Sequence, residues 1–148
     1  MSAMEEKDGT QNANNLVSAA SVFAINSRSA FVDHYPDLKN IGGQDWEFLL
    51  TIAGTGTALL SMAQTFSAER QRELTETVVL SLQAWNQSSF VELRDFLNSV
   101  TAGSKTQTEV PNAIGIWVLR SVREVTPDPM AAKVIGLMLM KTFASWWE

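Results

Sequence analysis

Residues 129–148 read PMAAKVIGLMLMKTFASWWE, and this stretch decides much of the fold of the 148-residue chain. Pro129 suits the first position of a helix, where its fixed φ is already helical and its missing N–H has no intrahelical partner. From Val134 to Met140 the chain carries only aliphatic residues, methionine and glycine. A helix that is apolar on every side has to be surrounded. We therefore expect it to be either the central helix of the domain or half of an interface, running to the C-terminus.

The end of this stretch places aromatic side chains at the chain terminus. Successive helical residues point about 100° apart, so Trp146 and Trp147 do not fit one core stripe. Chain ends usually lie at the surface, where a tryptophan is a typical interface anchor. We predict a protein interface, most simply between copies of the chain, that contains Leu139, Met140, Phe143, Trp146 and Trp147. The alternative is that one tryptophan closes the core and the other lies flat on the surface.

A second apolar stretch occupies residues 46–66, WEFLLTIAGTGTALLSMAQTF. No charged residue occurs between Glu47 and Glu69, which is long enough to cross a bilayer. Threonine, serine and glutamine dilute the stretch, however, and no basic cluster flanks it. The C-terminal stretch contains Lys133 and Lys141. We expect core helices and no membrane span.

The rest of the chain predicts further helices around these two. Residues 1–14 are polar and are expected to form a flexible arm, followed by one helical domain at 15–148. No stretch alternates with the period of a strand. The fold class is therefore all-α, a compact bundle or orthogonal array of about six helices. They are expected to start at Asn14 or Asn15 (ending by Pro36), near Asp45, at Ser67, at Ser89 (ending at Gly103), at Pro111 and at Pro129.

The fourth of these helices begins with a capping-box pattern, Ser89-Phe90-Val91-Glu92. In such a box the serine side chain accepts from a backbone N–H and the glutamate reaches back to the cap. We expect this helix to bury Phe90, Leu93, Leu97 and Val100.

Composition excludes several classes of function. The net charge of −5, from 11 basic and 16 acidic residues, argues against nucleic acid and anionic membranes as partners. Cysteine is absent, which excludes disulfides, iron–sulfur clusters and thiol nucleophiles. The N-terminus lacks the pattern of a secretory signal, so we expect a cytoplasmic protein. Charged residues make up only 18%, against about 25% in a typical protein, which favours association with a partner.

The candidates for chemistry are few, and we predict neither a metal nor a cofactor. His34, the one histidine, lies between Asp33 and Asp37. It could be a metal ligand or an oriented base, or part of a helix end that faces water. Arg120 and Arg123 could hold an anion or simply suit a helix C-terminus.

Four glycines fall inside predicted helices, where each costs about 1 kcal/mol relative to alanine. They are Gly54, Gly56, Gly115 and Gly136. Close contact between helices would compensate this cost. A small cavity that admits an apolar ligand between helices is the alternative.

These observations rank three functions. The first is a non-enzymatic interaction or assembly module that self-associates through its C-terminal helix. The second is a bundle that binds a small apolar ligand near the glycines. The third is an enzyme with His34 as its acid or base.

Overall fold

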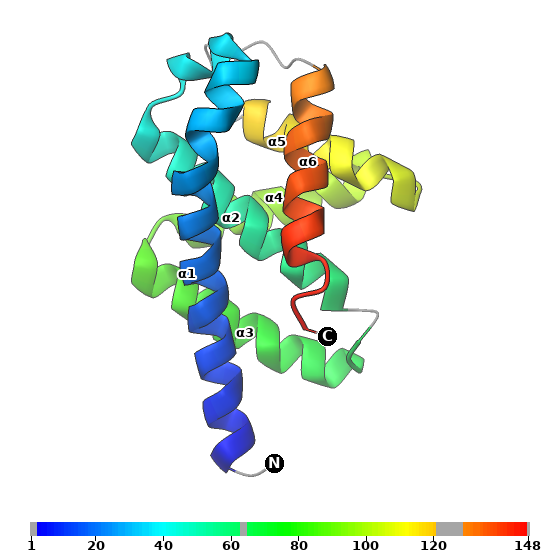
Figure 1. Ribbon diagram of the computed structural model, residues 1–148. Helices are drawn as coiled ribbons and strands as arrows, with labels where there is room; N and C mark the ends of the chain where they lie inside the picture. The colour runs from blue at the N-terminus through cyan, green and yellow to red at the C-terminus, as the bar shows by residue number, and fades with distance from the viewer. Residues whose placement is uncertain (1–2, 63–64, 121–128, 148) are drawn as a thin grey trace.

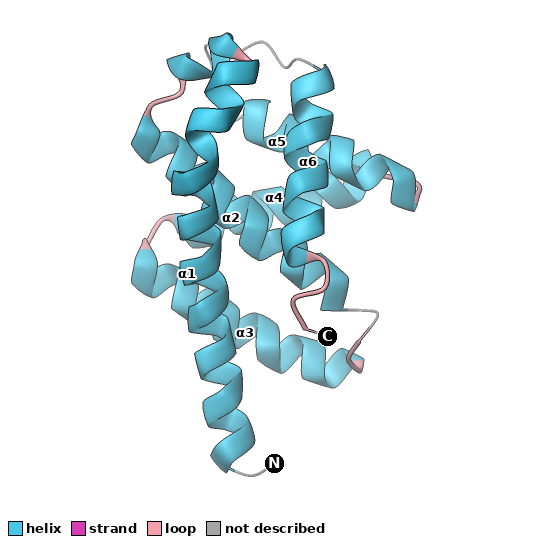
Figure 2. Cartoon of the chain, viewed as in Figure 1, coloured by secondary structure: helices cyan, strands magenta, loops and turns pink. Residues whose placement is uncertain are grey.

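A computed structural model describes residues 3–62, 65–120 and 129–147 (Figure 1). Within these ranges the chain forms helices only, with no strand (Figure 2). The all-α prediction is therefore confirmed for the described part of the chain. The elements are α1 (Ala3–His34), η1 (Pro36–Asn40), α2 (Gly43–Ser61), α3 (Ala68–Trp85), α4 (Ser89–Gly103), η3 (Gln107–Glu109), α5 (Val110–Arg120) and α6 (Pro129–Phe143).

The central helix is α2, which packs against α1, α4, α5 and α6. Its residues are buried without interruption from Leu49 to Leu59. The Thr57 hydroxyl donates to the Ala53 carbonyl of the same helix at 2.7 Å, which satisfies a polar group in the core. A helix that is buried on every side occupies the centre of its domain. It is thus the 46–66 stretch, and not the C-terminal one, that fills the centre.

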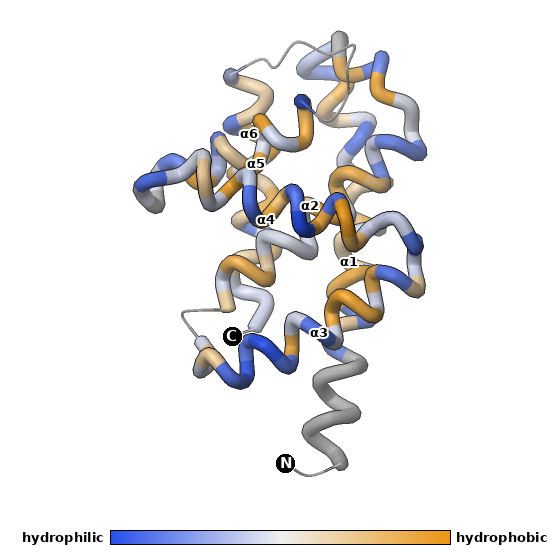
Figure 3. Tube along the Cα trace, turned by 180° about the vertical axis from the view of Figure 1, so that it is seen from behind, coloured by the Kyte–Doolittle hydropathy of each residue, from blue (hydrophilic) through white to orange (hydrophobic). Residues whose placement is uncertain are grey.

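Helices α1, α4, α5 and α6 pack around α2. Helix α1 crosses in front of α2 and also packs against α3 (Figure 1). Helices α5 and α6 pack closely against each other, and the Phe143 ring of α6 meets the Phe23 ring of α1 with centroids 5.8 Å apart. Seen from behind, hydrophilic residues gather at the start of α3 (Figure 3). There Glu69, Arg72 and Glu73 are exposed, as expected of a solvated helix face.

Helix α1 ends at His34, before Pro36, as the sequence predicts. The predicted start at Asn14 or Asn15 is wrong, because α1 already begins at Ala3. Residues such as Met, Glu and Lys favour helices, and extending an existing helix is cheaper than nucleating one. The division into an arm at 1–14 and a domain at 15–148 stays a prediction, with the difference that the segment from Ala3 on is helical.

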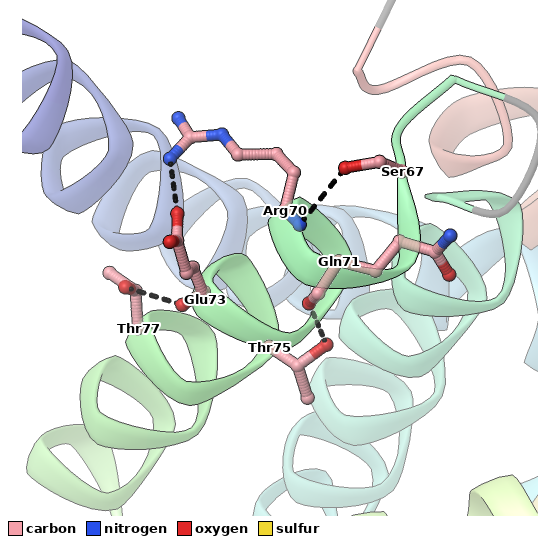
Figure 4. Close-up of polar contacts among 6 residues, drawn as sticks. All are labelled: Ser67, Arg70, Gln71, Glu73, Thr75 and Thr77. Carbon is pink, nitrogen blue, oxygen red and sulfur yellow. Dashed lines mark hydrogen bonds and ion pairs between the residues drawn. The ribbon is translucent and has the colours of Figure 1, made fainter. Parts of the chain in front are cut away.

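Helix α3 has the cap that the sequence predicts. The Ser67 hydroxyl accepts a hydrogen bond from the backbone N–H of Arg70 at 3.3 Å (Figure 4). The Arg70 side chain pairs with Glu73 at 3.2 Å on the same face. Helix α2 starts a little earlier than expected, with Gly42 as its cap and Asp45 inside the first turn.

The predicted capping box at the start of α4 is wrong. Its cap is Ser88, and Ser89 is its first residue, fully buried, with no hydrogen-bond partner for its hydroxyl among the described residues. The Asn86 side-chain oxygen accepts from the backbone N–H and the hydroxyl of Ser88, at 3.0 and 2.8 Å, and this local turn sets the start of the helix. The buried stripe shifts accordingly, because Phe90 is 41% exposed and Phe96 is in the core instead.

Candidate interaction surface

Helix α6 has one buried and one exposed face. Against α2 and α5 it buries Ala131, Ala132, Ile135, Gly136, Leu139 and Phe143. On the opposite side Leu137 is 46% exposed and Met138 41% exposed, between the exposed Lys133 and Lys141. The helix is therefore not surrounded by the described part of the chain. The sequence predicts α6 to be either the central helix or half of an interface, and the central position belongs to α2.

The C-terminal aromatics are held by the chain itself. Helix α6 ends at Phe143 and not at the terminus, and a turn follows. This turn lets both tryptophans pack back onto the domain, where each is partly buried. The Trp147 indole N–H donates to the Ala58 carbonyl at 2.9 Å, and its ring meets Phe66 edge-on at 5.9 Å. Trp146 lies against Phe143, with ring centroids 6.3 Å apart.

The five residues of the predicted interface are thus divided. Leu139 and Phe143 lie in the interior of the domain, out of reach of a partner. Trp146 and Trp147 are partly buried, so only part of each side chain is open to a partner. Met140 is also partly buried, and it lines a groove next to the exposed face of α6.

This groove lies where the ends of α2, α4 and α6 meet the start of α5, and we call it the α6 groove. It encloses about 340 Å³. Its lining is Thr57, Leu60, Ser61, Val100, Thr101, Ser104, Val110, Met140 and Ala144, none of which is charged. The hydroxyls of Thr57 and Ser61 donate to carbonyls of α2, and that of Ser104 donates to the Val100 carbonyl of α4, so the groove combines apolar side chains with hydroxyls that are already hydrogen-bonded.

The groove and the exposed face of α6 adjoin. Leu137 and Met140 are three residues apart on one helix, so their side chains are neighbours. Leu137 faces solvent and Met140 forms a wall of the groove. We define the α6 surface as Lys133, Leu137, Met138 and Lys141 together with the α6 groove.

The two lysines of this surface have no counter-ion in the described part of the chain. Neither forms an ion pair with a carboxylate there; the pair between Arg70 and Glu73 lies on α3. No aspartate or glutamate occurs in α6. The α6 surface is therefore apolar with a positive charge on either side of Leu137.

The four glycines are explained by close packing. A side chain at Gly54 would meet the Phe143 ring at 2.9 Å, and one at Gly56 would overlap the Phe96 ring. At Gly115 and Gly136 it would overlap the backbone carbonyls of Ala132 and Pro111 respectively, where α5 and α6 touch. The pocket proposed at these glycines is filled by the protein itself, and the α6 groove lies elsewhere.

The candidates for chemistry do not form a site in the described residues. His34 is exposed, and its Nδ1 lies 3.0 Å from the Ala30 carbonyl of its own helix. Asp33 is exposed as well, while the Asp37 side chain is outside the described residues. No group of three His, Cys, Asp or Glu that could hold a metal occurs in the described ranges.

Arg120 lines a second groove, between α4 and α5, of about 530 Å³. Glu92 and Asp95 of α4 line it too, and Asp95 accepts from the Trp117 indole N–H at 2.9 Å. Arg123 lies outside the described residues, so the arginine pair stays a prediction. With two carboxylates beside Arg120, this groove does not favour an anion.

Comparison with known proteins returns nothing: no family model matches the chain, nor does any curated protein or solved structure. Among the described helices we find none with the length and hydropathy that a bilayer crossing requires. The chain's function has to be argued from its own surface.

Sequence reasoning missed Leu137 and Met138 as surface residues. The pattern that identifies them is the position of Lys133 and Lys141, because lysine is rarely buried. Leu137 stands four residues from each lysine and so lies on the same side of the helix. The groove residues of α2, α4 and α5 could not be found in this way, since only the tertiary fold brings them together.

Proposed function

We propose that this protein is a non-enzymatic interaction module that binds a protein partner on the α6 surface. The observation that carries the proposal is the exposed face of α6, where Leu137 and Met138 lie beside an uncharged groove. Protein interfaces commonly combine an apolar centre that receives an anchor side chain with a charged rim. Methionine adds a flexible side chain that adapts to a partner.

Binding would proceed through burial of apolar surface. An apolar side chain of the partner enters the α6 groove beside Met140, and its neighbours cover Leu137 and Met138. Each Å² of apolar surface removed from water contributes about 25 cal/mol. Binding of another protein is the first form of this function, because the two lysines of the α6 surface would repel those of a second copy; self-association is the second form.

A site-specific crosslinker tests the proposal. A photoreactive amino acid is placed at position 137 of the full chain, in the cells that make it, and a matched control carries it at position 80. Leu80 is an ordinary exposed leucine on α3, with 67% of its surface accessible. We expect a covalent protein adduct from position 137 and none from position 80. The proposal fails if position 137 gives no adduct, or if both positions give the same ones.

A second candidate function is the binding of a small uncharged apolar molecule in the α6 groove. It is favoured by the lack of charged lining residues and by hydroxyls already bonded to their own helices. Native mass spectrometry of protein purified from its own cells would show an additional mass. Met140→Trp would fill the groove and remove that mass; a spectrum of the bare chain would count against this function.

A further inference from the structure

We infer that the partner of the α6 surface is an acidic amphipathic helix of another protein; this rests on the proposed function. Lys133 and Lys141 are both exposed on the side of α6 that carries Leu137. They meet no carboxylate of the described residues, and α6 supplies none. A partner that brings carboxylates to them and apolar side chains between them is complementary to this surface.

The spacing of the lysines sets the spacing of the partner's acidic residues. Lys133 and Lys141 are eight residues apart, which is about 12 Å along the helix axis. A partner helix lying alongside α6 meets both lysines with carboxylates seven or eight residues apart. Between them, apolar residues at helical spacing would cover Leu137 and Met138 and reach the α6 groove, in the manner of a helix bound in a groove.

The same lysines disfavour a second copy of the chain on this surface. If two α6 helices pack antiparallel with Leu137 opposite Leu137, Lys133 of each copy faces Lys141 of the other. If they pack parallel, each lysine faces its own counterpart. Like charges in direct opposition are repulsive, so both arrangements are penalised. An acidic helix replaces this repulsion by attraction.

An anionic lipid surface is the other partner that lysines attract, and the molecule favours it less. The exposed face of α6 has no aromatic residue, whereas helices that lie in the membrane interface commonly insert tryptophan or phenylalanine. The chain as a whole carries a net charge of −5, which opposes close approach to an extended anionic plane. A single helix touches only the α6 surface and avoids most of that repulsion.

Two designed peptides test the inference. Both are labelled 18-residue helices with leucines on one face; one carries a glutamate pair seven residues apart beside the leucines, the other a lysine pair. Fluorescence anisotropy measures their binding to the full chain. We expect the acidic peptide to bind at least tenfold more tightly than the basic one. Lys133→Glu with Lys141→Glu should reverse that order, and Leu137→Gln should weaken both peptides tenfold.

Matched variants control for general effects. Lys39→Glu changes an exposed lysine on η1, and Leu80→Gln changes an exposed leucine on α3; both should bind like the parent chain. Equal affinity for the two peptides, or no binding of either, would overturn the inference. So would binding to vesicles of anionic lipid in place of the peptide. If position 137 still crosslinks to a protein in any of these cases, the interaction module stands and only its acidic partner is withdrawn.

Discussion

Two serines near helix starts, Ser67 and Ser89, differ in what their hydroxyls do. The Ser67 hydroxyl caps α3 at the N–H of Arg70, whereas the Ser89 hydroxyl is buried in α4 without a partner in the described chain. Ser67→Ala should lower the free energy of unfolding by about 1 kcal/mol, because a helix cap is lost. Ser89→Ala should be neutral or stabilising, because an unsatisfied polar group leaves the core. Urea unfolding measures both variants. If Ser89→Ala lowered the free energy of unfolding as much as Ser67→Ala, Ser89 would be a helix cap, as the capping-box pattern predicts.

Glycine is required at position 115 by the contact between α5 and α6. A side chain there would overlap the Ala132 backbone, which cannot move aside as a flexible side chain could. Gly115→Ala should therefore cost about 3 kcal/mol of unfolding free energy. Gly43→Ala is the control, since a side chain at Gly43 meets nothing within 4 Å, and it should leave stability unchanged or raise it by up to about 1 kcal/mol. A Gly115→Ala protein as stable as its parent would mean that the two helices are further apart.

At the scale of the element, the two faces of α6 should respond differently to truncation. Leu139 is fully buried, and Leu139→Ala should cost between about 2 and 5 kcal/mol of unfolding free energy. Leu137→Ala removes an exposed side chain and should cost less than about 1 kcal/mol. Thermal unfolding of both variants distinguishes this orientation from a helix that is surrounded, where both losses would be large.

The identity of the helices could be predicted from the sequence, because local chemistry sets their ends. Pro36 follows the end of α1, Ser67 caps α3 and Pro129 opens α6, as expected. The start of α4 could not be predicted from the box pattern, because the Asn86 side chain binds Ser88 and makes a competing turn directly before the helix. Local rules thus succeed where one residue decides and fail where two local motifs compete.

The order of packing could not be predicted in the same way. The C-terminal stretch, apolar on every side, has the pattern of a central helix more fully than the threonine-containing 46–66 stretch, and the tertiary contacts nevertheless assign that place to α2. The turn after Phe143, which brings the Trp147 indole to the Ala58 carbonyl of α2, is also set by packing. What the sequence did contain was the position of Lys133 and Lys141, which marks the exposed side of α6.

For the whole molecule, the lysines of the α6 surface lead to a prediction about self-association. The parent chain should remain a monomer through this surface, because two-fold antiparallel packing about Leu137 sets Lys133 against Lys141 twice. Lys141→Glu turns both of these contacts into pairs of opposite charge, while Leu137 and Met138 remain to be buried between the copies. Each exposed pair contributes up to about 1 kcal/mol, so dimerisation should strengthen roughly tenfold or more at low salt. Sedimentation equilibrium measures the change.

The double variant, Lys133→Glu with Lys141→Glu, makes this prediction specific to one geometry. It sets like charges against each other again, now both negative, and should return the chain to the monomer. Lys39→Glu lowers the net charge by the same amount as Lys141→Glu but lies on η1, which packs against α1, so it should not promote dimers. A parent chain that already dimerises, and does so less when Lys141 is reversed, would show that copies meet by another arrangement. Parallel packing is also distinguishable, because there Lys141→Glu would set two glutamates together and would not create an attractive pair.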